Sequence, residues 1–336
     1  MPGKNHYHQS YRSFFWPVIL LGTGVIWLLS NLNIIPSENL WILLRLWPVL
    51  FIVAGLDVLF ARRLPGIGAL LALLVIGGVV YILLFGADLD IEGKPELHTQ
   101  SFVVDVGNTT LANVELNLST HETIIQSLTN SSRLIDAQVT HFGEIDFTVT
   151  GAEHKWIRLT HRSVLSFFPW FLPEVRDAHL SWNIGFSPEV PLNLVIDTST
   201  GISAIDLSGL NINRFELDGG TGASQVVLGA SDTGYEAYIT AGTGSLEIIF
   251  PEQSSIKVYL KGSTGRIQLQ MPEGAAVQIE VLRGGTGDLI LPAWITRVSG
   301  QQGRDEGVYQ STGFDDAVQQ IIVVVENIRT GNIFVE

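Results

Sequence analysis

The chain of 336 residues contains no cysteine. Disulfide frameworks, Cys-ligated zinc, iron–sulfur clusters and cysteine nucleophiles are therefore excluded. Basic residues are also few, because 19 Lys and Arg stand against 33 Asp and Glu, for a net charge of -14. Nucleic-acid binding needs clustered Lys and Arg to meet the phosphates, so this shortage argues against a nucleic-acid partner.

Charged residues as a whole are scarce. They make up 15% of the chain, against about 25% in an ordinary soluble protein, while 46% of the residues are hydrophobic. Residues 1–87 hold five basic and two acidic residues, and residues 88–336 hold 14 and 31, so the net charges are +3 and -17. We therefore expect an apolar membrane part followed by an acidic part outside the bilayer.

Three hydrophobic stretches follow one another near the N-terminus, at residues 14–32, 40–60 and 67–85. A spanning helix needs about 20 apolar residues, so we predict a transmembrane region over residues 14–87 with about three helices, preceded by a short cytoplasmic segment, 1–13. A signal peptide is the alternative for the first stretch. Three consecutive stretches without a small-residue cleavage site argue against it.

The first two stretches resemble each other. Phe15-Trp16-Pro17-Val18-Ile19 matches Leu46-Trp47-Pro48-Val49-Leu50. The short connection between them cannot cross the bilayer again, so the two copies are expected to run in opposite directions. Basic residues flank the first helix and follow the second, which by the positive-inside rule places residues 88–336 outside the cytoplasm.

Two charged residues interrupt the second stretch. Arg45 is expected near the outer interface, where its side chain can reach water. Asp57 has two interpretations: an intramembrane acid with a function, or a residue at the inner interface close to Arg62. We treat Arg45 and Asp57 as candidate contacts with lipid or with another membrane protein.

The acidic part contains a repeat whose turns carry glycine at a spacing of about 22 residues. Segments of alternating polar and apolar residues flank these turns and predict strands. A period of 20–50 residues indicates a solenoid. We predict an all-β solenoid of about six rungs over residues 191–336, begun by residues 192–196 and closed by 321–335. The turn glycines are Gly201, Gly222, Gly244, Gly265, Gly287 and Gly331.

Residues 88–190 are strand-rich but less regular, and we expect an N-terminal β-subdomain stacked on the solenoid. An aromatic segment at residues 164–173 breaks the strand pattern with two prolines. It either packs against the solenoid as a plug or forms an exposed loop that touches lipid or a partner. Its candidate contact residues are Phe167, Phe168, Trp170 and Phe171.

Recognisable catalytic motifs are missing. The Gly-Thr-Gly turns complete neither a dinucleotide fingerprint nor a phosphate loop, and no nucleophile elbow occurs. The histidines are scattered, and solvated or edge positions are expected for them. We therefore predict no catalytic residue, no cofactor and no metal site.

The helical pattern around Trp16-Pro17-Val18 and Trp47-Pro48-Val49 resembles the transmembrane region of the LiaI/LiaF-like bacterial membrane proteins. The segment from Val190 to Ile196, with turn-containing repeats like Ser203 to Leu210, looks like the toast-rack β-domains often attached to them. The resemblance implies a cell-envelope protein linked to the response to cell-wall-active antibiotics. LiaF proteins restrain an envelope-stress sensor kinase, so such a kinase is the partner that the resemblance implies.

The sequence is compatible with three functions. The first is a non-enzymatic bacterial membrane protein that presents an acidic β-solenoid to a partner, with the lipid bilayer as its other contact. The second is a self-associating envelope scaffold. The third is a carbohydrate-active enzyme, for which the sequence shows carboxylates without a recognisable arrangement.

Overall fold

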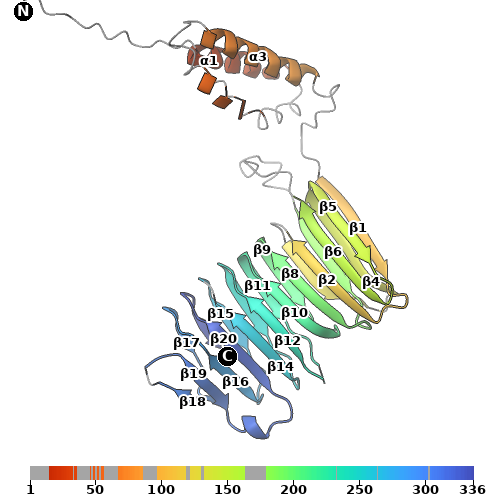
Figure 1. Cartoon of the computed structure of the whole chain (residues 1–336), viewed down its shortest axis with the longest axis vertical. Helices are drawn as coiled ribbons and strands as arrows, with labels where there is room; N and C mark the ends of the chain where they lie inside the picture. The colour runs from red at the N-terminus through yellow and green to blue at the C-terminus, as the bar shows by residue number, and fades with distance from the viewer. Residues whose placement is uncertain are drawn as a thin grey trace, which may run out of the picture. The chain divides into compact units, whose positions relative to one another are not determined.

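The computed structural model describes residues 15–32, 34–35, 46, 48–49, 51–52, 54–56, 67–85, 97–118, 122–129, 132–162, 179–231, 233–262, 264–301 and 303–336. Contacts divide the chain into two compact units, Met1–Glu96 and Leu97–Glu336 (Figure 1). The first unit is helical and the second is built from strands. The expected change from an apolar helical part to a β-rich part is thus present.

The helical unit contains α1 (Phe15–Asn31) and α3 (Ile67–Phe85). The two helices pack closely at Gly22, where an added Cβ would lie 2.3 Å from Cδ1 of Ile76. Small residues allow such close approach between apolar helices. Among the described residues, no helix combines the length and the hydropathy needed to span a membrane. The number of spanning helices therefore stays a prediction.

The β-unit consists of two sheets (Figure 1). The ten-stranded sheet runs β1 (Leu97–Asp105), β4 (Arg133–Phe142), β7 (Ser181–Phe186), β3 (Glu122–Ser127), β9 (Thr200–Asp206), β11 (Thr221–Val227), β13 (Ser245–Ile249), β15 (Ile267–Gln270), β21 (Ile333–Val335), β17 (Leu289–Ile290). The eleven-stranded sheet runs β18 (Ile295–Gly300), β19 (Gly307–Ser311), β16 (Val277–Val281), β20 (Ile321–Asn327), β14 (Ile256–Lys261), β12 (Tyr235–Thr240), β10 (Ile212–Asp218), β8 (Leu192–Thr198), β2 (Leu111–Leu118), β6 (His154–Arg162), β5 (Glu144–Thr150). A short 3-10 helix, η3, covers Phe314–Asp316.

Each rung of the β-unit contributes one strand to each sheet, and successive rungs pair in parallel. The alternation of polar and apolar residues turns one side chain in two toward the space between the sheets. In the eleven-stranded sheet, Leu194, Phe215, Ala237 and Val258 are register partners on consecutive strands, and all four are buried. Such columns of buried side chains form one continuous core, which no single rung could bury by itself.

The spatial order of the rungs differs from their order along the chain. The C-terminal rung, β20–β21, lies between rung β14–β15 and rung β16–β17, so the run 321–335 does not close the stack as expected. Likewise, rung β2–β3 lies between rung β6–β7 and rung β8–β9. Sequence periodicity follows chain order and gives no sign of such insertion.

Antiparallel strands complete both ends of the stack. Strand β19 pairs antiparallel with β16 and β18, and β5 pairs antiparallel with β6. In the ten-stranded sheet, β4 pairs antiparallel with β1 and β7. Strand β2 pairs in parallel with β8, and both lie in the same compact unit.

Candidate functional site on the outer face of the eleven-stranded sheet

A groove of about 570 Å³ runs across the outer face of the eleven-stranded sheet. Its lining side chains come from β5, β6, β2, β8 and β10, which are consecutive in this sheet. We call it the outer groove. Its polar and aromatic lining includes Trp156, Arg158, Glu115, Asn113, Asn193 and Arg214.

The strand period explains why these side chains point outward. On β2, Asn113 and Glu115 alternate with Ala112, Val114 and Leu116, which are buried. Because successive side chains of a strand point to opposite faces, burial of the apolar side chains places the polar side chains between them on the outer face. In-register pairing with the neighbouring strands then aligns the outward residues in rows across the sheet.

Trp156 is the large aromatic side chain of the groove. It lies on β6 with 63% of its surface exposed. Its register partners are Thr150 on the edge strand β5 and Asn113 on β2, both shorter side chains. Tryptophan is highly buried on average, so such exposure beside a groove marks a candidate contact surface.

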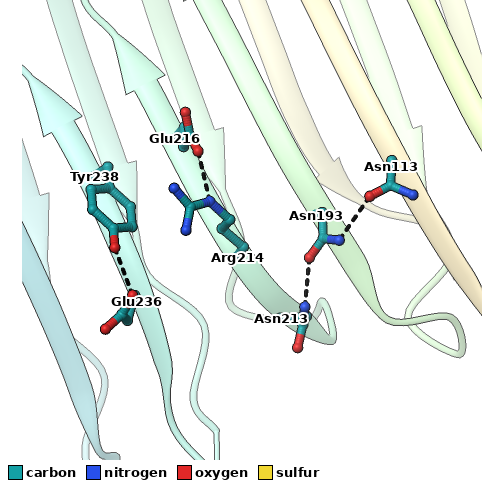
Figure 2. Close-up of polar contacts among 7 residues, drawn as sticks. All are labelled: Asn113, Asn193, Asn213, Arg214, Glu216, Glu236 and Tyr238. Carbon is teal, nitrogen blue, oxygen red and sulfur yellow. Dashed lines mark hydrogen bonds and ion pairs between the residues drawn. The ribbon is translucent and has the colours of Figure 1, made fainter.

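Two arginine–glutamate pairs line the groove. Nε and Nη2 of Arg158 donate to Oε2 of Glu115 at 2.9 and 2.7 Å, which joins β6 to β2. On β10, Nε of Arg214 donates to Oε1 of Glu216 at 2.6 Å (Figure 2). These pairs are partly exposed, and exposed pairs add little to stability. Their main effect is to orient four planar charged groups and to balance their charge.

An amide ladder connects three neighbouring rungs. Nδ2 of Asn213 donates to Oδ1 of Asn193 at 2.6 Å, and Nδ2 of Asn193 donates to Oδ1 of Asn113 at 2.8 Å (Figure 2). Asn113 and Asn193 are register partners, and Asn213 lies at the irregularity between Ile212 and Arg214 on β10. The asparagine side chains bridge the strand spacing of about 4.8 Å. Asn113 and Asn193 belong to the groove lining, so the ladder fixes the orientation of these two amides.

The polar surface continues beyond the groove onto β12 and β14. The rings of Tyr238 and Tyr259 are stacked with centroids 4.8 Å apart, and the guanidinium of Arg214 lies 4.2 Å from the Tyr238 centroid. The Tyr238 hydroxyl donates to Oε2 of Glu236 at 2.6 Å (Figure 2). This contact with Glu236 raises the pKa of Tyr238. Arg214 therefore links the outer groove to an aromatic stack.

An acidic pair lies on the same face. Asp197 and Asp218 are register partners on β8 and β10. Partial burial, and then the neighbouring Asp218, raise the pKa of Asp197. Like charges directly opposite each other on neighbouring strands are destabilising, so this row adds to the acidic character of the unit at a cost in stability.

The predicted turn glycines lie in one column at a corner of the rungs. An added Cβ on Gly222 would lie 1.9 Å from the Gly201 carbonyl oxygen, and one on Gly244 would lie 1.5 Å from that of Gly222. The column continues through Gly265, which approaches Gly244, and Gly287, which approaches Gly331. Gly201 and Gly222 also have φ values of 145° and 156°, which favour glycine. Close approach between backbones therefore explains glycine at this corner.

A histidine cluster at one end of the core was missed by the sequence analysis. His141 on β4 is fully buried, contrary to the expected solvated or edge position. Its ring lies 5.8 Å from that of His161 and 6.1 Å from that of His98. The alternation Ala137, Val139, His141 on one strand was the available signal, because it places the histidine on the buried face.

The environment of His141 disfavours its charged form. Burial, and then the neighbouring His161, lower the pKa of His141, while the nearby backbone of Phe142 opposes this. Both ring nitrogens of His141 are buried, and neither makes a hydrogen bond within the described part of the chain. Among the described residues, no group of three or more His, Asp or Glu side chains is arranged to hold a metal ion.

Six predicted contact residues lie outside the described residues, and their roles stay predictions: Arg45, Asp57, Phe167, Phe168, Trp170 and Phe171.

Two family models match the chain. Residues 14–59 match the LiaI-LiaF-like transmembrane region, and residues 92–249 match the N-terminal domain of toast_rack. The chain joins a LiaI-LiaF-like transmembrane region to a toast-rack domain. The toast-rack match includes every strand that lines the outer groove. Neither model describes a catalytic domain, and the first indicates membrane anchoring.

Solved structures resemble this chain only distantly. A candidate cell adhesion protein from Clostridium sporogenes is 17% identical, with a TM-score of 0.47 over 72% of this chain and 99% of that one. A candidate adhesin from Bacteroides fragilis is 12% identical, with a TM-score of 0.29 over 72% and 98% of the two chains. No curated protein is detectably similar in sequence to this chain.

Proposed function

We propose that this chain is a non-enzymatic, multi-pass membrane protein of the bacterial cell envelope that presents its β-unit outside the cytoplasm for partner binding. One observation carries the proposal: a LiaI-LiaF-like transmembrane region and a toast-rack domain match the same chain. The outer groove, with an exposed tryptophan and oriented polar groups, is the surface we assign to binding. Stacked rungs suit this role because they offer extended, rigid faces.

The role we propose for this binding is to modulate a cell-envelope stress response, as LiaF-like proteins do. A membrane sensor kinase is then the partner of the helical unit. Arg45 and Asp57 of the helical unit are the candidate residues that contact the kinase. Carboxylates of the outer groove support binding over catalysis, since Glu115 and Glu216 are each held by an arginine.

The orientation can be tested with a single introduced thiol. Because the chain has no cysteine, a Val318→Cys variant carries one labelling site, and Val318 is 97% exposed. We expect a membrane-impermeant maleimide to label this introduced thiol in intact cells. Labelling only after the membrane is opened would place the β-unit in the cytoplasm and refute the proposal.

The stress-response role has its own test. Deleting the gene should change the output of an envelope-stress reporter when cells meet a cell-wall-active antibiotic, and the full-length protein should restore it. A reporter that responds equally with and without the gene would reject this role while leaving the orientation result intact.

A further inference from the structure

The outer groove combines a flat aromatic surface with planar polar groups. Trp156 offers an exposed indole on β6, and Arg158, Glu115 and Asn113 follow it in the rows of the sheet. An aromatic face binds the apolar face of a ligand, while amide, carboxylate and guanidinium groups bind its polar edge. A pyranose ring has both features, because its C–H groups form an apolar face and its hydroxyls surround the rim.

Hydrogen-bonding capacity remains available along the groove. The amide ladder uses one N–H of Asn193 and one of Asn213, and each amide has two N–H donors and two acceptor sites. Sugar hydroxyls both donate and accept. A row of pre-oriented amides therefore suits a hydroxyl-rich ligand and loses little conformational freedom when the ligand binds.

The charge of the groove indicates an uncharged ligand. Its lining holds two arginines and two glutamates, paired as Arg158 with Glu115 and Arg214 with Glu216. Residues 88–336 carry a net charge of -17 around this balanced patch, so a polyanion would be repelled. A cationic ligand would have to compete with arginine for each carboxylate.

The position of the groove disfavours an extended peptide. Peptides that add a strand bind at a sheet edge, which here is β5, whereas most of the groove lies over β6, β2 and β8, which each pair with neighbours on both sides. The groove crosses five strands at about 4.8 Å spacing, a span of roughly 20 Å. A volume of about 570 Å³ also lies within the range of ligand sites, about 300–1,000 Å³.

We propose that the outer groove binds a neutral oligosaccharide, with Trp156 stacking on one sugar ring and with Asn113 and Asn193, which the amide ladder orients, binding the hydroxyls of its neighbours. The inference deepens the proposed function, on which it rests, by naming the chemical class of the ligand. Binding without cleavage is expected, because each groove glutamate is paired with an arginine.

The test measures binding of defined sugars to the full chain in nanodiscs by isothermal titration calorimetry. The probes are hexamers of β-1,4-linked N-acetylglucosamine and of β-1,4-linked glucose, with hexagalacturonate as the anionic comparison. We expect saturable binding of at least one neutral hexamer and none of the anionic one. Trp156→Ala should weaken that binding on the order of tenfold or more, and Trp156→Phe should lose less.

Trp294→Ala is the matched control, since Trp294 is a partly exposed tryptophan of the same β-unit outside the groove. It should bind the neutral hexamer like the unchanged protein. Absence of binding by both neutral hexamers, preference for the anionic hexamer, or equal loss in the two tryptophan variants would overturn the inference. Labelling of the Val318→Cys variant from outside the cell, together with absent sugar binding, would reject the glycan inference alone and leave the proposed function standing.

Discussion

The glycine column makes a quantitative prediction about what holds the rungs at their spacing. In Gly244→Ala, the new Cβ would lie 1.5 Å from the Gly222 carbonyl oxygen, roughly 2 Å short of the 3.3–3.6 Å at which a carbon meets such an oxygen. The obstacle is backbone of the adjacent rung, so rotation of a side chain cannot relieve the overlap. The two rungs must separate locally.

Separation would strain the backbone hydrogen bonds around this corner. Between these two rungs, the Thr243 N–H donates to the Gly220 carbonyl at 3.0 Å, and the Gly219 N–H donates to the Thr240 carbonyl at 2.8 Å. Loss of both bonds costs about 2 kcal/mol, and the overlap itself adds about 1–3 kcal/mol. We therefore expect Gly244→Ala to lower the free energy of unfolding by about 3–5 kcal/mol, which corresponds to a melting temperature lower by roughly 6–20 °C.

Far-UV circular dichroism of the full chain during heating measures this change. Two glycines provide controls. An added Cβ on Gly284 would lie 3.3 Å from the carboxylate of Glu306, a flexible side-chain end, and Gly274 has φ 74° with open space around it. Gly284→Ala should change little, and Gly274→Ala should cost about 1–2 kcal/mol from backbone strain alone. If Gly244→Ala melted like Gly284→Ala, close approach of the rungs could not be the reason for glycine.

Three further changes test the core, the histidine cluster and the acidic row. Phe215→Ala, at a fully buried position, should lower the free energy of unfolding by about 3–5 kcal/mol in chemical denaturation, through the cavity it leaves. The pKa of His141 is lowered from 6.5 in the folded chain, so the unfolded chain binds the proton first as the pH falls. The contribution of His141 to the free energy of unfolding is therefore fully present above pH 6.5. Below that pH it declines by at most about 1.4 kcal/mol per pH unit. In melting curves recorded at several pH values, His141→Phe should flatten the dependence of stability on pH, whereas His154→Asn, at an exposed position, should not. Equal slopes of stability against pH in the two variants would count against this role of His141. Asp218→Asn should raise stability at pH 7 by a few tenths of a kcal/mol and lose that gain at pH 3, where a persisting gain would point to a cause other than charge.

The rung architecture could be predicted where a local pattern encodes it. Strand alternation and the turns from Gly201 to Gly265 follow chain order, and β8 to β15 stack in that same order. The insertion of β20–β21 beside β14–β15 could not be predicted in this way. Which strands pair in parallel depends on which sheet edges are unpaired when a distant segment folds onto the stack. The local pattern of residues in a strand does not contain that information.

The candidate site was harder to predict than the fold. Trp156 and Arg158 lie on a segment whose strand pattern was recognised, but its neighbour in space is β2, far away in the sequence. The groove forms only when the outward side chains of five neighbouring strands come into register. His141 could have been assigned to the core from its place in the alternation with Val139, whereas its approach to His161 and His98 depends on pairing between strands.

The central claim is that the outer groove of a membrane-anchored β-unit is the binding surface of this protein. The most direct test is photo-crosslinking in living cells, with benzoylphenylalanine in place of Thr150, which lines the groove beside Trp156, or, in a second strain, in place of Trp294. We predict a cross-linked product, formed by insertion into sugar C–H bonds, at position 150 and none at position 294. Absence of a product at position 150, or equal products at both positions, would contradict the claim.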